Sequence, residues 1–206
     1  SQGAPTLESV DASGNLAGQW GGGIHLEQTD ATLSDIRATD NLADYGGGGV
    51  SIDSGTVVVD GAWIEDNESL YFGGGLYVYS SEMTLRDIDV IGNRADSEGG
   101  GLYVYQVGGS VEHGWFEYNT VMHMGGGLSI QRSDVTIAQS VVVRNIAVDG
   151  AGLSIYDCDP TLHHMIVADN FAALTGGGIY AFSTQGVWSH VVAAANVTSN
   201  YGAGIY

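Results

Sequence analysis

Apolar residues recur along this chain with a period of 26 residues, and each recurrence follows a cluster of glycines. The apolar residue stands nine positions after an asparagine in every repeat but one, because the step from Leu128 to Leu153 is 25 residues. A second apolar residue follows two positions later, as Val78 follows Leu76, so a short strand with alternate residues inward is predicted there. The residues that follow the glycines are Ile24, Val50, Leu76, Leu102, Leu128, Leu153, Ile179 and Ile205.

Two further apolar pairs precede each asparagine. One lies ten and eight residues before it, as in Val57 and Val59, and the other lies five and three residues before it, as in Ala62 and Ile64. Nothing in the repeat has the 3.6-residue period of a helix. Three short strands in a fixed period are typical of a parallel β-helix, and strand crossovers favour right-handed winding. We therefore predict an all-β fold, a right-handed parallel β-helix (solenoid) of about eight coils of 26 residues with three short strands per coil.

The repeated asparagines and glycines are expected to build the corners of the coils. Glycine permits a positive φ and leaves no side chain to collide with the next coil. Asparagine side chains stacked at one bend can donate and accept hydrogen bonds along the stack and satisfy backbone groups that the bend would orphan. The predicted structural ladder comprises Asn15, Asn41, Asn67, Asn93, Asn119, Asn145, Asn170 and Asn196.

Residues 1–206 are interpreted as a single β-helix domain that forms a segment of a longer solenoid. The first and last residues fall inside coils, so both ends would expose apolar core and unpaired strand edges. Continuation of the solenoid, self-association or a covering partner would each protect those edges.

The charge balance narrows the possible partners. The chain has no lysine, and five arginines stand against 24 carboxylates, for a net charge of −19. Such a surface repels nucleic acid and anionic lipid, so we expect no nucleic-acid partner. No apolar run approaches the roughly 20 residues of a membrane helix, so no direct membrane insertion is expected. The same charge also serves solubility, without any specific ligand.

Aromatic residues occupy the predicted outward positions of the glycine-led strand. Rings in adjacent coils should be neighbours about 5 Å apart on one face. They could stack on sugar rings or form a hot spot for a protein partner, or they could be a ladder that only stabilises the rod. The predicted ligand-binding or partner-binding residues are Tyr77, Tyr79, Tyr103, Tyr105, Tyr156, Tyr180 and Phe182.

A second outward strip lies four and two residues before the asparagines. It is polar and aromatic in the early coils, with Trp63, Asp89 and Trp115, and apolar in the last three. The apolar part would pack on another subunit or another part of the protein, unless the inward and outward phase is slipped by one residue there. The predicted interface residues are Val141, Val143, Ile166 and Val192.

Candidate metal-binding or catalytic residues are few. Asp157, Cys158 and Asp159 lie close in sequence to His163 and His164, but they lack the ligand spacing of a zinc site or the oxygen cage of a calcium site. Charged residues elsewhere are scattered and do not form a paired acid and base. We therefore expect no metal, no cofactor and no catalytic residues, and consider the absence of enzyme activity the better interpretation.

The repeat also resembles a known family. A glycine pair or triplet followed by an aliphatic residue, together with the apolar-x-x-Asn elements from Ile64 to Asn67 and from Phe116 to Asn119, resembles the passenger repeats of polymorphic outer membrane proteins. The resemblance runs from Pro5 to Tyr206 and extends to right-handed parallel β-helix repeat proteins of bacterial surfaces in general. It implies a surface-exposed adhesin or passenger module, while similar rods also carry polysaccharide lyases and glycosidases.

The expected function is therefore a non-catalytic extracellular or cell-surface rod that acts as a structural, adhesive or partner-binding module. The expected location is extracellular or on a bacterial cell surface, and the expected partner is a protein or a glycan. The alternative is a carbohydrate-active enzyme or a glycan-binding module on the same β-helix.

Overall fold

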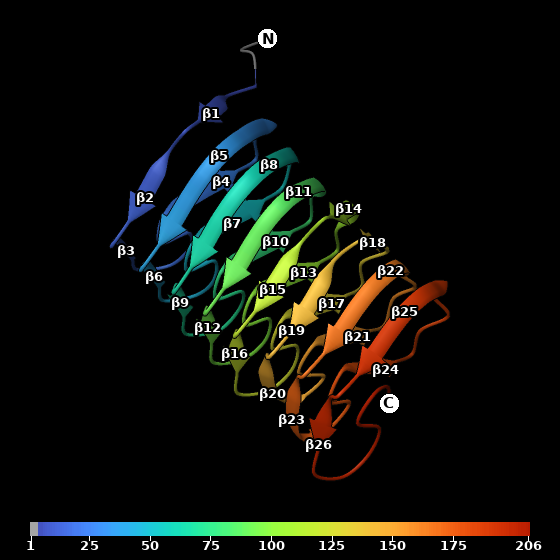
Figure 1. Ribbon diagram of the computed structural model, residues 1–206. Coiled ribbons are helices and arrows are strands. Elements are labelled where there is room, and N and C mark those ends of the chain that lie inside the picture. The colour runs from blue at the N-terminus through green and yellow to red at the C-terminus, as the bar shows by residue number, and fades with distance from the viewer. Residues whose placement is uncertain (1–3) are drawn as a thin grey trace.

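The computed structural model describes residues 4–206, which form a parallel β-helix of about seven turns without any helix (Figure 1). Every strand pairs in parallel with its equivalent in the next coil, as Leu76 pairs with Leu102. The predicted fold class, with a spacing of about 26 residues and three sheets per coil, is confirmed. Since the described residues contain no helix, none there could cross a membrane.

The first of the three sheets follows the glycine clusters and is called the glycine-led sheet. It has seven strands, each of four residues, and its inward residues Leu76 and Val78 are fully buried. The strands are β4 (Ile24–Glu27), β7 (Val50–Asp53), β10 (Leu76–Tyr79), β13 (Leu102–Tyr105), β17 (Leu128–Gln131), β21 (Leu153–Tyr156) and β24 (Ile179–Phe182).

The second sheet, called the long-strand sheet, contains both of the other predicted strand positions. In five coils one bent strand runs through both positions, and in the remaining three coils the strand is split in two. The strands are β1 (Thr6–Glu8), β2 (Asp11–Ser13), β5 (Ala31–Thr39), β8 (Thr56–Glu65), β11 (Glu82–Ile91), β14 (Gly108–Glu112), β15 (Trp115–Glu117), β18 (Thr136–Ala138), β19 (Val141–Val143), β22 (Thr161–Ala168) and β25 (Trp188–Ala194).

The third sheet, called the corner sheet, consists mostly of two-residue strands directly after the asparagines, where no strand was predicted. The 25-residue step is absorbed here, because the register between β20 and β23 shifts after Ala147. The strands are β3 (Leu16–Ala17), β6 (Leu42–Ala43), β9 (Glu68–Ser69), β12 (Arg94–Ala95), β16 (Thr120–Val121), β20 (Ile146–Asp149), β23 (Phe171–Thr175) and β26 (Val197–Thr198).

The bend in the long-strand sheet has a single backbone cause. The residue six positions before each asparagine adopts the left-handed conformation, with φ between 49° and 76°. Asparagine, aspartate, histidine and glycine tolerate this conformation best, and six of the eight residues are aspartate, histidine or glycine. The bend residues are Ser9, Asp35, Gly61, Asp87, His113, Gln139, His164 and His190.

The asparagine column lies inward and is hydrogen-bonded along the stack. The side-chain amide of Asn93 donates to the carbonyl of Ile64 at 2.9 Å and to Oδ1 of Asn119 at 3.1 Å. Its own Oδ1 accepts from the backbone N–H and the side-chain amide of Asn67, at 3.0 and 2.9 Å. The same pattern joins the other asparagines, so the corner leaves few backbone groups without a partner.

The glycine corner is closed to larger side chains. A Cβ on Gly74 would lie 2.4 Å from the carbonyl oxygen of Arg94, and Gly73 has a φ of 59°. Both the close approach of the next coil and the left-handed backbone therefore require glycine here.

Candidate functional site

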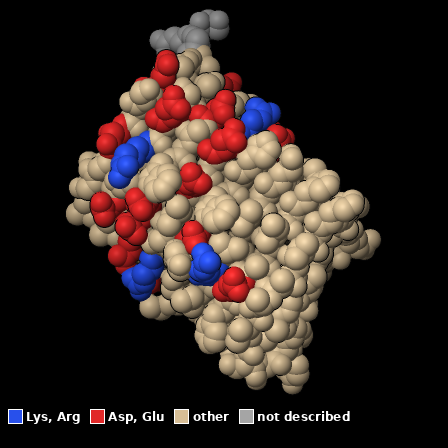
Figure 2. All heavy atoms as spheres, viewed as in Figure 1, with Lys and Arg blue, Asp and Glu red and all other residues tan. Residues whose placement is uncertain are grey.

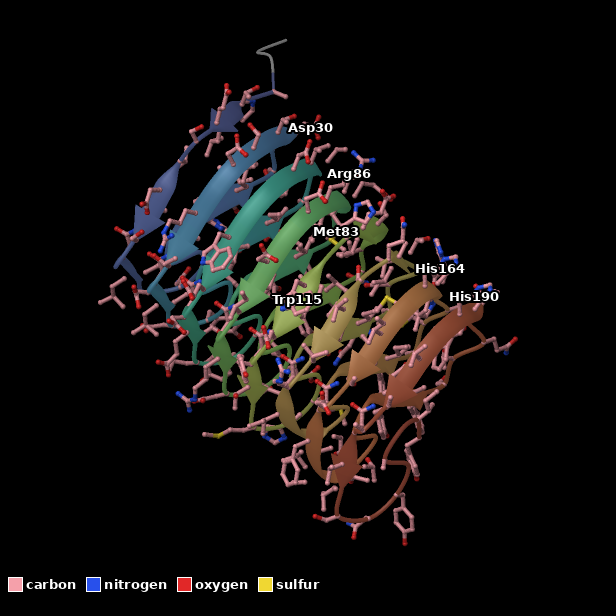
Figure 3. The ribbon with its side chains drawn as sticks, in the orientation of Figure 1. Asp30, Met83, Arg86, Trp115, His164 and His190 are labelled. Carbon is pink, nitrogen blue, oxygen red and sulfur yellow. The ribbon has the colours of Figure 1, made fainter. Side chains whose placement is uncertain are left out.

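The outer face of the long-strand sheet carries the tryptophan strip, one outward residue from each coil after the first, four positions before the asparagines. Trp63 and Trp115 are 39% and 38% exposed, while the residues beside them on the same strands, Ile64 and Phe116, are buried. Trp115 lies on β15 in this face (Figure 3). Alternation in and out continues to the last coil, so the phase does not slip. The strip consists of Arg37, Trp63, Asp89, Trp115, Val141, Ile166 and Val192.

Both tryptophan rings are held in place by a hydrogen bond from the indole N–H to a glutamate. The indole N–H of Trp63 donates to Glu65 at 2.8 Å, and that of Trp115 donates to Glu117 at 2.9 Å, each two residues along its own strand. Glu117 also accepts a hydrogen bond from Arg144 of the next coil. Because each ring is held from a rigid strand, its free face is oriented before any ligand arrives.

A shallow hollow of about 310 Å³ opens beside Trp63. It arises because Gly61 supplies no side chain in the bend column, between Asp35 and Asp87 of the neighbouring coils. Partial burial raises the pKa of the Asp89 carboxyl at its edge. The lining residues are Asp35, Ile36, Arg37, Gly61, Ala62, Trp63, Asp87 and Asp89.

The second half of the strip is apolar. Ile166 and Val192 are 46% and 52% exposed, and no Asp, Glu, Lys or Arg follows Asp169 in the chain. Figure 2 shows the charged side chains gathered over the N-terminal coils and a neutral surface over the C-terminal coils. The two halves of one strip therefore present different chemistry.

One predicted interface residue is not available for contact. Val143 points outward from β19, but it is only 8% exposed because it lies between Glu117 and Ala168 of the two adjoining strands. The expectation that Val143 is exposed is wrong, whereas Val141 is partly exposed beside it.

The predicted tyrosine strip is also partly covered. Tyr77 and Tyr103 are only 8% and 6% exposed, which corrects the expectation of four accessible rings in adjacent coils. The ring of Trp20 lies 4.5 Å from that of Tyr77, and the ring of Phe72 lies 4.9 Å from that of Tyr103. These covering residues precede the glycine clusters, and their bulk is the sequence signal that was missed. Burial raises the pKa of both phenols well above their usual range.

The other rings of the strip form stacked pairs across adjacent coils. Tyr79 and Tyr105 have ring centroids 5.8 Å apart, and Tyr156 and Phe182 have centroids 5.1 Å apart. Tyr180 stacks on Tyr206 at 5.6 Å. Among the predicted contact residues, only Phe182 is largely exposed, at 50%, so this strip offers less accessible aromatic surface than expected.

A partly buried carboxylate lies next to the covered tyrosines. Glu98 accepts hydrogen bonds from Ser129, at 3.1 Å, and from Gln131. Desolvation raises the pKa of Glu98, and the bond from Ser129 opposes that shift in part.

The cysteine and histidine cluster does not assemble. Cys158 is buried with its Sγ 3.6 Å from the carbonyl of Ile130, while His164 and His190 stack in the bend column with centroids 4.7 Å apart (Figure 3). Asp134 accepts a hydrogen bond from the backbone N–H of Asp159 at 2.8 Å, so it stabilises a turn. Within residues 4–206 no group of three or more histidine, cysteine or acidic residues could hold a metal ion.

The sequence profile of the right-handed beta helix region matches residues 22–206. No curated protein and no solved structure matches the chain. Because the profile covers most of the sequence and the strands pair in parallel from coil to coil, the chain belongs to the right-handed β-helix family.

Proposed function

We propose that this chain is a non-catalytic adhesive module, extracellular or on a cell surface, that binds a neutral glycan along the first half of the tryptophan strip. The observation that supports the proposal is the pair of exposed tryptophans, each anchored to a glutamate two residues away. Such rings combine an apolar face with a polar edge, and a sugar ring can stack on that face.

The geometry suits an extended ligand. Trp63 and Trp115 stand two coils apart, which corresponds to about 10 Å along the rod at the usual strand spacing. A glycan lying along the rod would stack one sugar on each ring, with Asp89 between them to bind a hydroxyl group. Arg37 and the hollow beside Gly61 extend the same surface by one coil.

The charge selects a neutral glycan. With a net charge of −19 the protein repels uronic acids and other anionic sugars, so acidic polysaccharides should bind poorly. A protein partner on the exposed Phe182 and its stacked neighbour Tyr156 is less well supported, because those rings are fewer and mutually packed.

Glycoside hydrolysis is the second candidate, favoured by the raised pKa of Asp89 beside other carboxylates at the hollow. Non-catalytic binding is preferred because Asp87 pairs with His113 at 3.4 Å and is directed to that partner. Release of reducing ends from a bound neutral glycan would favour the hydrolase.

A glycan array that spans neutral and acidic polysaccharides tests the proposal. The wild type should retain at least one neutral glycan, and Trp63→Ala or Trp115→Ala should each weaken binding about tenfold, since a stacked ring contributes roughly 1.5 kcal/mol. Phe182→Ala is the matched control and should bind as the wild type does. Retention of no glycan, or equal binding by the tryptophan variants, would refute the proposal.

A further inference from the structure

The C-terminal end of the long-strand sheet has an exposed apolar surface, called here the apolar patch. It consists of the outward residues of three successive parallel strands, while their inward neighbours Val142 and Val167 are fully buried. The patch is therefore held rigid by the core beneath it. Its members are Val141, Ile166, Ala168, Val192 and Ala194.

The distribution of charge restricts what can cover this patch. The chain has a net charge of −19, and the last 37 residues, after Asp169, contain no charged side chain. Two copies that approach through the N-terminal coils would bring carboxylates against carboxylates. Approach through the C-terminal coils avoids that repulsion, so the patch is the surface on which a second copy of this chain can dock (Figure 2).

The rim of the patch is self-complementary. Arg144 and Asp169 are both exposed and stand at equivalent positions on adjacent coils, just after β19 and β22. If two rods cross antiparallel about a two-fold axis between these coils, Arg144 of each copy faces Asp169 of the other. A two-fold contact is isologous, so one such pairing is made twice.

We propose that two copies of this chain associate through the apolar patch, with antiparallel rods and with Arg144 of each copy opposite Asp169 of the other. The small side chains let two sheet faces approach to about the usual 10 Å separation, and the charged pairs lie at the rim, where interface charges are generally found. Because the two-fold axis lies between β19 and β22, these two strands face each other at the centre and β25 of each copy covers β15 of the other at the edge. The contact involves few strands, so the dimer is weak and depends on concentration.

Sedimentation velocity of the whole chain over a wide concentration range tests this inference. The wild type should shift from monomer towards dimer as the concentration rises, and Ile166→Glu should remain monomeric at every concentration. Phe182→Glu adds the same charge to an exposed apolar position on the glycine-led sheet and should dimerise normally. Thermal melts of each variant show that the fold is retained.

A charge swap tests the arrangement itself. Asp169→Arg should weaken the dimer at least tenfold, and the double variant Arg144→Asp with Asp169→Arg should restore it in part. Arg144 also binds Glu117 within its own chain, so the melts of these variants must be compared as well.

Three outcomes overturn the inference. The first is a wild type that stays monomeric at all concentrations. The second is a dimer that persists in Ile166→Glu, which would assign association to the end coils. The third is binding of the wild type to phosphatidylcholine vesicles without any self-association, which would assign the patch to lipid.

Discussion

The two halves of the tryptophan strip lie over the same kind of buried core, but their outward side chains differ. Beneath both halves the inward residues are buried aliphatics or Phe116, and the asparagine column runs without interruption. Outside, Trp63, Asp89 and Trp115 give way to Val141 and Ile166 on the same column. In a stacked coil the inward columns are constrained by their neighbours, whereas the outward columns are free to differ. Changes along an outward column therefore indicate where the rod meets other molecules.

The largest expected effect tests whether the interior is in fact common to both halves. Asn93→Leu and Asn170→Leu should each destabilise the fold by about 3 kcal/mol, because each leaves buried backbone and amide groups without partners. Chemical denaturation measures both, and Asn15→Leu at the exposed end is the control and should cost far less. If only one of the two buried asparagines proves essential, the interior differs between the halves after all.

A smaller effect concerns the anchoring of the tryptophans in the first half. Glu65→Ala and Glu117→Ala remove the acceptors of the two indole N–H groups, so binding of the neutral glycan should weaken about threefold to tenfold, as for one lost hydrogen bond. Glu112→Ala removes a carboxylate on the same sheet that pairs with Arg86 and should leave binding unchanged. Equal binding by all three variants would show that the indole orientation does not matter.

The fold could be predicted from the period because each repeat must bury its apolar residues against its neighbours. The site was predictable only in part. The position of a residue in the repeat shows whether its side chain points outward. It does not show that Trp20 covers Tyr77 from two coils away, because the Trp20 ring reaches Tyr77 only across Gly46, which has no side chain. The hollow at Gly61 was not predicted, because a missing side chain at one position of the bend column leaves a hollow only where the side chains of the neighbouring coils surround it.

The smallest expected effect is a difference in pH dependence between the halves. Burial raises the pKa of Glu98, so the folded state binds a proton more tightly than the unfolded state. Its contribution to stability is therefore greatest below the usual carboxyl value of 4.5 and declines as the pH rises through the folded pKa. Glu98→Gln should flatten the decline of melting temperature above that pH, whereas Asp169→Asn in the second half should not. If the melting temperature of Glu98→Gln declines with pH as steeply as that of the wild type, the pH dependence arises from other carboxylates.

The most direct test of the divided strip is the affinity for a neutral glycan retained by the wild type, measured by calorimetry on three proteins at low concentration. The division predicts that Ile166→Glu binds as tightly as the wild type, while the double variant Trp63→Ala with Trp115→Ala loses about a hundredfold or more. Equal loss in Ile166→Glu, or none in the double tryptophan variant, would contradict the division of the strip into a glycan-binding half and a self-associating half.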